Sequence, residues 1–326
     1  MSSTNTTSSD QPGMSLRNWL LLLCLSILWG GSFFLNAVII KHVPVLSIVF
    51  FRVFFAAVFL LLFMKITKTT ITINRSIIGS FLVMGLVNNF IPFTLIVGGQ
   101  AHIGSGLAAV LNATTPLFAA VVAHISTNDP TERLGPKRII GILFGVAGVT
   151  VLLAPKLGEV GFSGNEVFGQ IAILGAALSY GLAVVYGRRF GKQGISPVVA
   201  ATGQVSASSF LLLPLVLIID KPWTYLGSID LNTFTSMLSL SIFCTAFAYI
   251  LYFKLIKDAG ATNASLVTLL VPVSAIILGV LFLGETFTAN TAAGMACIGL
   301  GLLVIDGRIF RYWRKSTLKT ADNGSD

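Results

Sequence analysis

Charged residues are scarce in this chain. Of its 326 residues, 10% are Asp, Glu, Lys or Arg, whereas 55% belong to hydrophobic types and the mean hydropathy is +0.89. A soluble domain carries about 25% charged residues, because its surface must meet water. The shortage excludes a soluble protein and predicts an integral membrane protein.

Cysteine, histidine and intramembrane acids are scarce too. The three cysteines lie singly in apolar stretches, so neither a disulfide framework nor a thiolate zinc site is expected. The three histidines lie at predicted span ends without mutual spacing, and no Asp or Glu lies in the core of a span. A Gly-rich phosphate loop is lacking as well. The sequence therefore predicts no metal, no cofactor and no enzyme.

Long apolar runs are abundant. They lack the period-2 alternation that membrane-spanning strands need, so helices are predicted. A span needs about 20 residues, and the chain length allows roughly ten of them. Charges, prolines and polar clusters divide the chain into ten spans, near residues 19–40, 44–64, 77–98, 105–125, 139–154, 167–187, 197–219, 233–256, 263–283 and 289–306.

The basic residues test this division. Assigning loops to alternate sides places Lys41, Lys156 and Lys221 on one side and leaves Arg52 within a span; the other 17 of the 21 Lys and Arg residues gather on the opposite side. Basic residues stay on the cytoplasmic side, so both termini are predicted to be cytoplasmic in a multi-pass protein of the cell (inner) membrane. Residues 1–16 and the basic residues 311–326 are predicted tails, the first disordered. The net charge of +9 faces anionic lipid, and no nucleic-acid partner is expected.

An internal repeat divides the chain. Small residues and a proline match between spans 4 and 9 at an offset of 156, and a Glu and two glycines match around spans 5 and 10 at an offset of 153. The difference implies a short insertion near residues 128–131. Five spans per half is an odd number, so the second half enters the bilayer from the opposite side; such inverted repeats are typical of transporters. The matched residues are Gly104, Ala108, Pro116 and Ala119 with Gly260, Ala264, Pro272 and Ala275, and Glu132, Gly141 and Gly148 with Glu285, Gly294 and Gly301.

Four short motifs carry a family resemblance. They are LWGGSF at residues 28–33, FRV at 51–53, LNATTPLF at 111–118, and Gly284-Glu285 before a glycine-rich last span. Together they resemble the ten-span EamA-type exporters of the drug/metabolite transporter superfamily. Many relatives carry a Lys shortly after the Trp-Gly pair, where this chain has Asn36 and Ala37, so a solute contact of that Lys is not expected here.

The resemblance implies a fold class and a domain organisation. The fold is an all-α integral membrane protein of ten transmembrane helices in two inverted five-helix repeats, residues 17–156 and 157–310. A central cavity is implied between them, lined mainly by spans 1 to 4 and 6 to 9. The resemblance also implies export of small metabolites.

Two side chains at membrane depth are the first candidates for contact with a solute. Trp29 lies about 15 Å along span 1, away from the interfacial aromatic belt. It is predicted to wall a cavity, the alternative being a packing or lipid-facing ring. Arg52 is the only charge inside a span, so it must face the protein interior or a wet cavity. It either binds a carboxylate or phosphate or bonds backbone carbonyls; the structural role is favoured, because Gln204 of span 7 is one residue out of register with it.

Other polar side chains lie deep in the spans. Each either bonds a neighbouring helix or lines a solvated pathway. Asn112 is the best of these candidates, because it lies one turn before Pro116, whose missing N–H frees a backbone carbonyl. The full set of predicted substrate-binding residues is Trp29, Ser32, Asn36, Arg52, Asn88 (beside Asn89), Asn112, Thr115, Tyr180, Gln204 and Thr268.

Glycines and prolines predict shape rather than chemistry. Gly30, Pro116 and Pro272 are predicted to form kinks or gates. The GxxxG pair Gly141 and Gly145 in span 5 and the small residues of span 10 predict a close packing seam. That seam lies either within the fold or between the two protomers of a homodimer.

These features predict a secondary transporter. It moves small metabolites, such as amino acids or drug-like solutes, outward by alternating access, and its partners are that small-molecule solute and the lipid bilayer. A nucleotide-sugar or organic-anion carrier is the alternative, and it should show more fixed positive charge than Arg52 alone. A membrane-embedded enzyme is less favoured, because no cluster of acids, bases or metal ligands lies at one depth.

Overall fold

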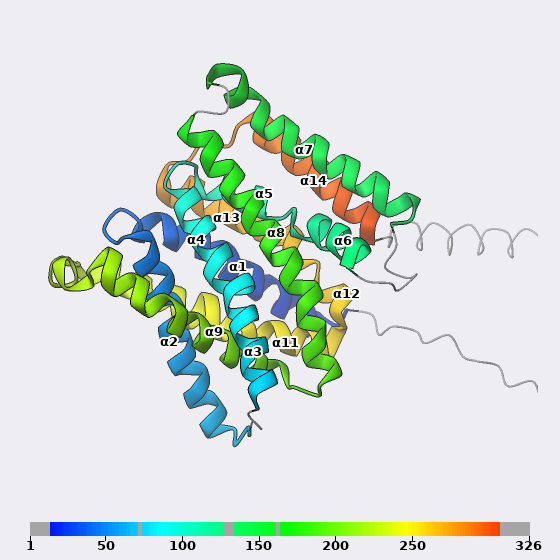
Figure 1. Ribbon diagram of the computed structural model, residues 1–326. Helices are drawn as coiled ribbons and strands as arrows, with labels where there is room; N and C mark the ends of the chain where they lie inside the picture. The colour runs from blue at the N-terminus through cyan, green and yellow to red at the C-terminus, as the bar shows by residue number, and fades with distance from the viewer. Residues whose placement is uncertain (1–13, 71–73, 127–133, 161–163, 307–326) are drawn as a thin grey trace, which may run out of the picture.

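The computed structural model describes residues 14–70, 74–126, 134–160 and 164–306. The predicted tails (apart from residues 14–16 of the first), the insertion near residues 128–131 and Glu132 lie outside these ranges. Within them, eight helices are long and apolar enough to cross a membrane, and two shorter apolar helices, Val267–Leu283 and Ala289–Ile305, complete the ten predicted spans (Figure 1). The prediction of an all-α membrane fold is confirmed.

The first half of the chain holds spans 1 to 5. Spans 3 and 4 each consist of more than one helical segment. In order, the elements are α1 (Leu16–Ile39) as span 1, α2 (Val45–Ile66) as span 2, α3 (Arg75–Gly85), the π-helical η1 (Leu86–Phe90) and α4 (Ile91–Gln100) as span 3, α5 (Ser105–Asn112) and α6 (Thr115–Ser126) as span 4, and α7 (Pro136–Val160) as span 5.

The second half holds spans 6 to 10. Two short 3₁₀ turns, η5 (Pro222–Thr224) and η6 (Leu226–Ser228), join spans 7 and 8. The spans are α8 (Asn165–Lys192) as span 6, α9 (Pro197–Leu215) and the π-helical η4 (Val216–Asp220) as span 7, α10 (Leu231–Ser241), the π-helical η7 (Ile242–Phe247) and α11 (Ala248–Ala259) as span 8, α12 (Ala261–Ala264) and α13 (Val267–Leu283) as span 9, and α14 (Ala289–Asp306) as span 10.

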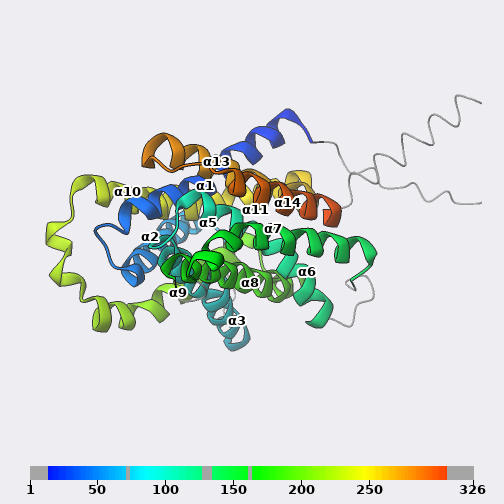
Figure 2. The ribbon, with the colours of Figure 1, turned by 90° about the horizontal axis from the view of Figure 1, so that it is seen from above.

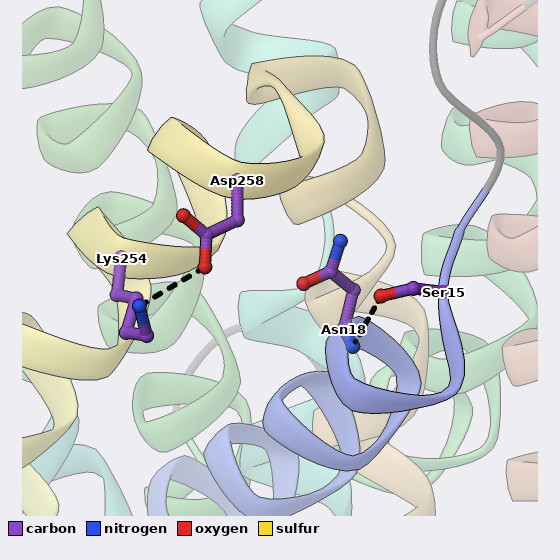
Figure 3. A network of polar contacts seen from close by, with 4 residues as sticks. All are labelled: Ser15, Asn18, Lys254 and Asp258. Atoms are coloured by element: carbon purple, nitrogen blue, oxygen red, sulfur yellow. Dashed lines mark hydrogen bonds and ion pairs between the residues drawn. The ribbon is translucent and has the colours of Figure 1, made fainter.

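Polar side chains at helix ends fix where the spans begin. The Ser15 hydroxyl accepts a hydrogen bond from the Asn18 N–H at 3.2 Å and so caps α1 (Figure 3). Near this cap, Lys254 and Asp258 form an ion pair of 3.1 Å on the last turns of α11, which packs against α1. We call this side of the molecule, where α1 begins and α14 ends, the terminal face, and the opposite side the distal face (Figure 2).

Helices pack in pairs that recur between the halves. α1 packs on α13 as α8 packs on α6, and span 3 packs on α9 and α8 as span 8 packs on α2 and α1. α2 packs on α9 and α7 on α14, each with its own counterpart from the other half. One pair of glycine contacts illustrates the recurrence. Gly30 lies against Ser274 and Ala275, and Gly181 lies against Phe118 and Ala119, which precede Ser274 and Ala275 by 156 residues.

The seam between α7 and α14 explains the glycines of spans 5 and 10. A Cβ at Gly141 would lie 2.6 Å from the Gly301 carbonyl oxygen, and one at Gly148 would lie 2.8 Å from the Gly294 oxygen. The start of α7 thus meets the end of α14, so the two helices run antiparallel, as Figure 1 shows. Because glycine is needed on both sides, the predicted seam is filled within one chain. It gives no support to a homodimer through these spans.

Buried apolar side chains form two main clusters. One is centred on α1, α5, α11 and α13, and the other on α2, α4, α9 and η7. Lipid is as apolar as these side chains, so close van der Waals packing rather than hydrophobic burial holds the helices together. Tyr180 of α8 packs against both clusters and therefore lies where they meet.

Carboxylates join the two halves at the distal face. Glu285, between α13 and α14, accepts hydrogen bonds from the N–H groups of Ser105 (2.6 Å) and Gly106 (3.0 Å) at the start of α5. Asp220, at the end of η4, accepts from the N–H (2.8 Å) and hydroxyl (2.7 Å) of Ser47 at the start of α2. An anion at a helix start is stabilised by the free N–H groups and the helix dipole. We call these two contacts the distal clasps.

The terminal face lacks the same closure between spans 4 and 9. There, α6 packs on α8 and α7, whereas the described residues of α12 and α13 make no comparable packing with α6. Among the described residues, span 4 thus packs on span 9 mainly through α5, near the distal face. This difference between the faces breaks the symmetry of the paired helices.

Alanine substitutions in α14 test the seam. A methyl at Gly301 would lie 2.5 Å from the Gly141 oxygen, whereas one at Gly299 meets nothing within 4 Å. We expect Gly301→Ala to lower the free energy of unfolding by about 1–3 kcal/mol through overpacking. Gly299→Ala should be neutral or raise it by up to about 1 kcal/mol, because alanine favours helix. Thermal unfolding of the two purified variants measures this; equal losses would contradict the antiparallel seam.

Candidate functional site

Two helices that are equivalent in the repeat are interrupted at the same place. α3 and α10 are both eleven residues long, and each passes into a π-helical segment, η1 and η7. The offset is 156, the value that relates spans 4 and 9: Arg75 corresponds to Leu231 and Leu86 to Ile242. π-Helical turns inside α-helices are rare and occur frequently at functional sites. The two interruptions therefore mark the middle of spans 3 and 8 as the candidate site.

Arg52 of α2 contacts the second of these interruptions and the helix that follows the first. Its side chain is buried, with 6% exposed, and its Nε donates a hydrogen bond to Thr245 Oγ1 of η7 at 3.0 Å. Its guanidinium carbon lies 3.7 Å from the centroid of the Phe93 ring of α4, a cation–π contact. Tyr180 and Tyr249 are close enough to interact with it electrostatically. Among the described residues, no carboxylate pairs with this guanidinium.

Two asparagines of η1 extend the polar contacts across the halves. Asn88 Nδ2 donates to Gln204 Oε1 of α9 at 3.1 Å, and Asn89 Nδ2 donates to the Tyr249 hydroxyl of α11 at 3.3 Å. Asn89 is fully buried, and its Oδ1 has no hydrogen-bond partner. We call this group the Arg52 cluster; its members are Arg52, Asn88, Asn89, Phe93, Tyr180, Gln204, Thr245 and Tyr249.

Serines from the second half complete the first interruption. Ser208 donates to the Gly85 carbonyl at 2.6 Å and Ser179 donates to the Val87 carbonyl at 2.7 Å. A π-helical turn changes the hydrogen-bond pattern of its helix, so neighbouring carbonyls need other donors in a membrane. α8 and α9 supply them, which holds η1 in place.

A row of aromatic rings links the cluster to Trp29. The ring centroids are 6.2 Å apart for Tyr249 and Phe253, 5.7 Å for Phe253 and Tyr252, and 5.2 Å for Tyr252 and Trp29. The first three rings lie on α11, and Trp29 lies on α1. Trp29 is half-buried and packs, with Tyr252, against the buried cluster centred on α1, α5, α11 and α13.

The structure groups four of the predicted residues and separates others. Arg52, Asn88, Tyr180 and Gln204 belong to the cluster, and Trp29 joins it through the aromatic row. Asn36 lies apart, where its Nδ2 donates to Gln100 Oε1 of α4 at 3.1 Å. Asn112, at the end of α5, has a buried Oδ1 without a partner. The remaining three are hydroxyl residues that bond carbonyls of their own segments, namely Ser32 to Trp29, Thr115 to Asn112 and Thr268 to Ser265.

The predicted kinks fall in different places. Span 4 is interrupted at residues 113–114, so Pro116 lies in the first turn of α6, where a proline is tolerated. α13, in contrast, continues through Pro272, and the break in span 9 lies at residues 265–266. Gly30 lies inside an uninterrupted helix and permits its close contact with span 9. Gating by any of the three stays a prediction.

Phe93, Thr245 and Tyr249 were not predicted. A lone Thr, Tyr or Phe in an apolar run carries no distinctive signal. The internal repeat could have pointed to two of them, because the offset of 156 residues relates Asn89 to Thr245 and Phe93 to Tyr249. The described residues contain no group of three His, Cys, Asp or Glu side chains that could bind a metal ion.

A double-mutant cycle tests whether Asn88 and Gln204 interact. Each single change to Leu should lower the free energy of unfolding, because it leaves the other amide unpaired in a membrane interior. The coupling energy should be about 0.6 kcal/mol and not above about 1.7 kcal/mol. Asn88→Leu with Thr150→Val is the control, since Thr150 is exposed on α7. Equal coupling in both cycles would contradict the contact.

The chain is similar to proteins that are described as transporters. The family model described as the EamA-like transporter family matches residues 17–154 and again 167–306. The chain is 25% identical over 287 residues to the uncharacterized transporter YoaV of Bacillus subtilis, covering 87% of this chain and 94% of YoaV. It is 28% identical over 274 residues to the uncharacterized inner membrane transporter YedA of Escherichia coli, covering 82% and 83%.

A solved structure shares the fold. Titled "Crystal structure of protein", it matches with a TM-score of 0.62 and 17% identity over 88% of this chain and 96% of its own. The likeness supports the arrangement of helices. With two copies of the family model along almost its whole length, the chain is a multi-pass membrane protein that belongs to the EamA-like transporter family.

Proposed function

We propose that the protein is a secondary transporter that exports small metabolites, such as amino acids or drug-like solutes, by alternating access, and that the solute binds at the Arg52 cluster. The observation that carries the proposal is the meeting of two interrupted, repeat-equivalent helices at one buried polar cluster. In transporters built from inverted repeats, the solute site lies near the middle of the bilayer at the repeat interface and is formed by discontinuous helices.

Several contacts support inverted halves. α7 and α14 occupy equivalent places in the repeat and run antiparallel. The cluster takes residues from spans 2 and 3 of one half and from spans 6, 7 and 8 of the other. Two similar bundles of opposite orientation can exchange conformations, so that a site between them faces each side in turn.

The difference between the faces supports one particular state. The distal clasps close spans 2 and 4 of the first half onto spans 7 and 9 of the second, whereas α6 stands away from span 9 at the terminal face. With both termini in the cytoplasm, as the basic residues predict, the distal face is the outer one. We infer that the structure is the inward-facing arrangement, with the outer gate closed.

Counterflow in proteoliposomes tests the proposed function. Vesicles are loaded with a ¹⁴C-labelled amino-acid mixture, and efflux is measured with and without the unlabelled mixture outside. Because an alternating-access site returns faster when occupied, external solute should accelerate efflux of the labelled one. The control is vesicles without protein. Efflux that external solute leaves unchanged would indicate a channel, and hydrolysis products without solute flux would indicate an enzyme.

Trp29→Ala tests the aromatic row. The Trp29 ring is half-buried and lies against the Tyr252 ring. Because the ring is not fully buried, its loss should leave the yield of folded protein near normal while reducing flux several-fold. Trp19→Ala is the control, because that ring is 43% exposed at the start of α1. A collapse in the yield of folded Trp29→Ala would instead assign the ring a structural role.

Glu285→Gln tests the outer gate. The amide keeps one acceptor but removes the charge that holds two N–H groups of α5, so the gate should open more often. The readout is labelling of Ser105→Cys by an impermeant maleimide from outside, in a chain whose three native cysteines are replaced. We expect roughly tenfold faster labelling, the equivalent of 1.4 kcal/mol.

Asp230→Asn is the matched control for the gate. Asp230 caps its own helix through the Thr233 N–H and joins no other span. Labelling should therefore be unchanged in this variant. Acceleration of labelling by both variants, or by neither, would contradict a clasp at Glu285.

A further inference from the structure

We propose that Arg52 is the receptor for a carboxylate group on the transported solute, so that carboxylate-bearing organic solutes are the substrate class. The inference rests on the proposed function and specifies the chemistry of its site. It starts from a buried guanidinium in a membrane interior for which the described residues provide no counter-ion.

The protein satisfies Arg52 only in part. The hydrogen bond to Thr245 uses Nε, and the Phe93 ring covers one face of the guanidinium. The other side chains close to it are neutral hydroxyl and thiol groups, Tyr180, Tyr249 and Cys244. A charge buried without a counter-ion is costly, and an Arg at membrane depth marks a functional site by default. What is missing from this environment is an anion.

The free part of the guanidinium has the geometry of a carboxylate receptor. With Nε engaged, the two terminal nitrogens remain as a planar pair of donors, which matches the two oxygens of a carboxylate. Thr245 and Phe93 fix the plane from two different spans, so the pair is held in one orientation. This use of both partners makes Arg52 a positioned donor rather than a mobile surface charge.

A second group nearby offers the complementary chemistry. Asn89 Oδ1 is buried and has no hydrogen-bond partner. The Asn89 amide nitrogen donates a hydrogen bond to the Tyr249 hydroxyl, which in turn interacts electrostatically with Arg52. An unpaired buried acceptor is rare and calls for a donor. A solute with a carboxylate for Arg52 and an ammonium or hydroxyl for Asn89 would satisfy both, and the aromatic row from Tyr249 to Trp29 offers contact for an apolar body.

Inversion of the repeat does not duplicate this charge. At the offset of 153 that relates spans 2 and 7 at Pro44 and Pro197, the counterpart of Arg52 is Val205. A residue that only locked helices together would be expected at both equivalent contacts, because the helices pack alike there. The repeat thus provides one guanidinium at this site, which suits a ligand that binds once, between the halves.

Matched solute pairs test the proposal. Purified protein in vesicles is offered carboxylates and their uncharged primary amides, with aliphatic, aromatic, hydroxyl- and amino-bearing bodies, and uptake of each pair is compared. We expect at least one pair to show roughly tenfold or greater preference for the carboxylate. In Arg52→Gln that ratio should fall to about one. In Thr150→Val, which removes a hydroxyl on the exposed face of α7 outside the cluster, the ratio should persist.

Each outcome decides between the alternatives. The absence of carboxylate preference in every pair, its survival in Arg52→Gln, or its loss in Thr150→Val with Arg52 present would overturn the proposal. If Arg52→Gln does not fold, Arg52→Lys replaces it; the ratio should fall several-fold because the ammonium lacks the planar pair, and an unchanged ratio overturns the proposal. Equal flux of acids and amides would overturn the carboxylate proposal but not the proposed transport function. The absence of counterflow for every solute would overturn the transport function itself.

Discussion

A polar group inside a bilayer must find its partner within the protein, and this constraint organises the centre of the molecule. The π-helical turns of spans 3 and 8 disturb the hydrogen-bond ladders of their helices, and hydrocarbon offers no water to repair them. Ser179 and Ser208 repair the first from the opposite half, and Thr245 bonds the Leu240 carbonyl while accepting from Arg52. An interrupted helix is therefore stable in the membrane only where the other half supplies hydrogen-bond partners. This explains why the cluster lies where the two halves meet.

The same constraint separates a fixed centre from movable ends. At the centre, polar contacts join span 3 to spans 6, 7 and 8 and span 2 to span 8, so separating these spans would expose an amide, a hydroxyl or a charge. At the distal face, spans 4 and 9 are joined by a carboxylate on two N–H groups, and water can replace that carboxylate as the helices part. Weak, hydratable contacts at the ends and dense ones in the middle suit a carrier whose gates open around a site that stays assembled.

The sequence predicted the spans well because a hydrophobic run of about 20 residues has few interpretations. It also singled out Arg52, Asn88, Tyr180 and Gln204, which the structure brings into one cluster, because each is unusual at membrane depth. It gave hydroxyl residues equal weight, whereas in the structure Ser32, Thr115 and Thr268 donate to carbonyls three residues earlier, a contact that sequence alone does not reveal. The π-helical turns were beyond reach for a similar reason, since composition does not distinguish them from α-helix. Extending the offset of 156 from span 4 back to span 3 would have found Thr245 and Tyr249.

The mismatch between Arg52 and Gln204 in the sequence reflects a real asymmetry. The Gly85 Cα of span 3 packs against the Gln204 carbonyl, and Ser241 of span 8 bonds the Phe51 carbonyl, so Phe51 rather than Arg52 is the structural counterpart of Gln204. The backbones of spans 2 and 7 thus obey the repeat while their side chains do not. In the proposed mechanism, a symmetric backbone would allow the two gates to exchange roles. An asymmetric charge at the centre of the proposed site would give the solute one orientation in both states, because the guanidinium would stay between the same spans whichever gate is open.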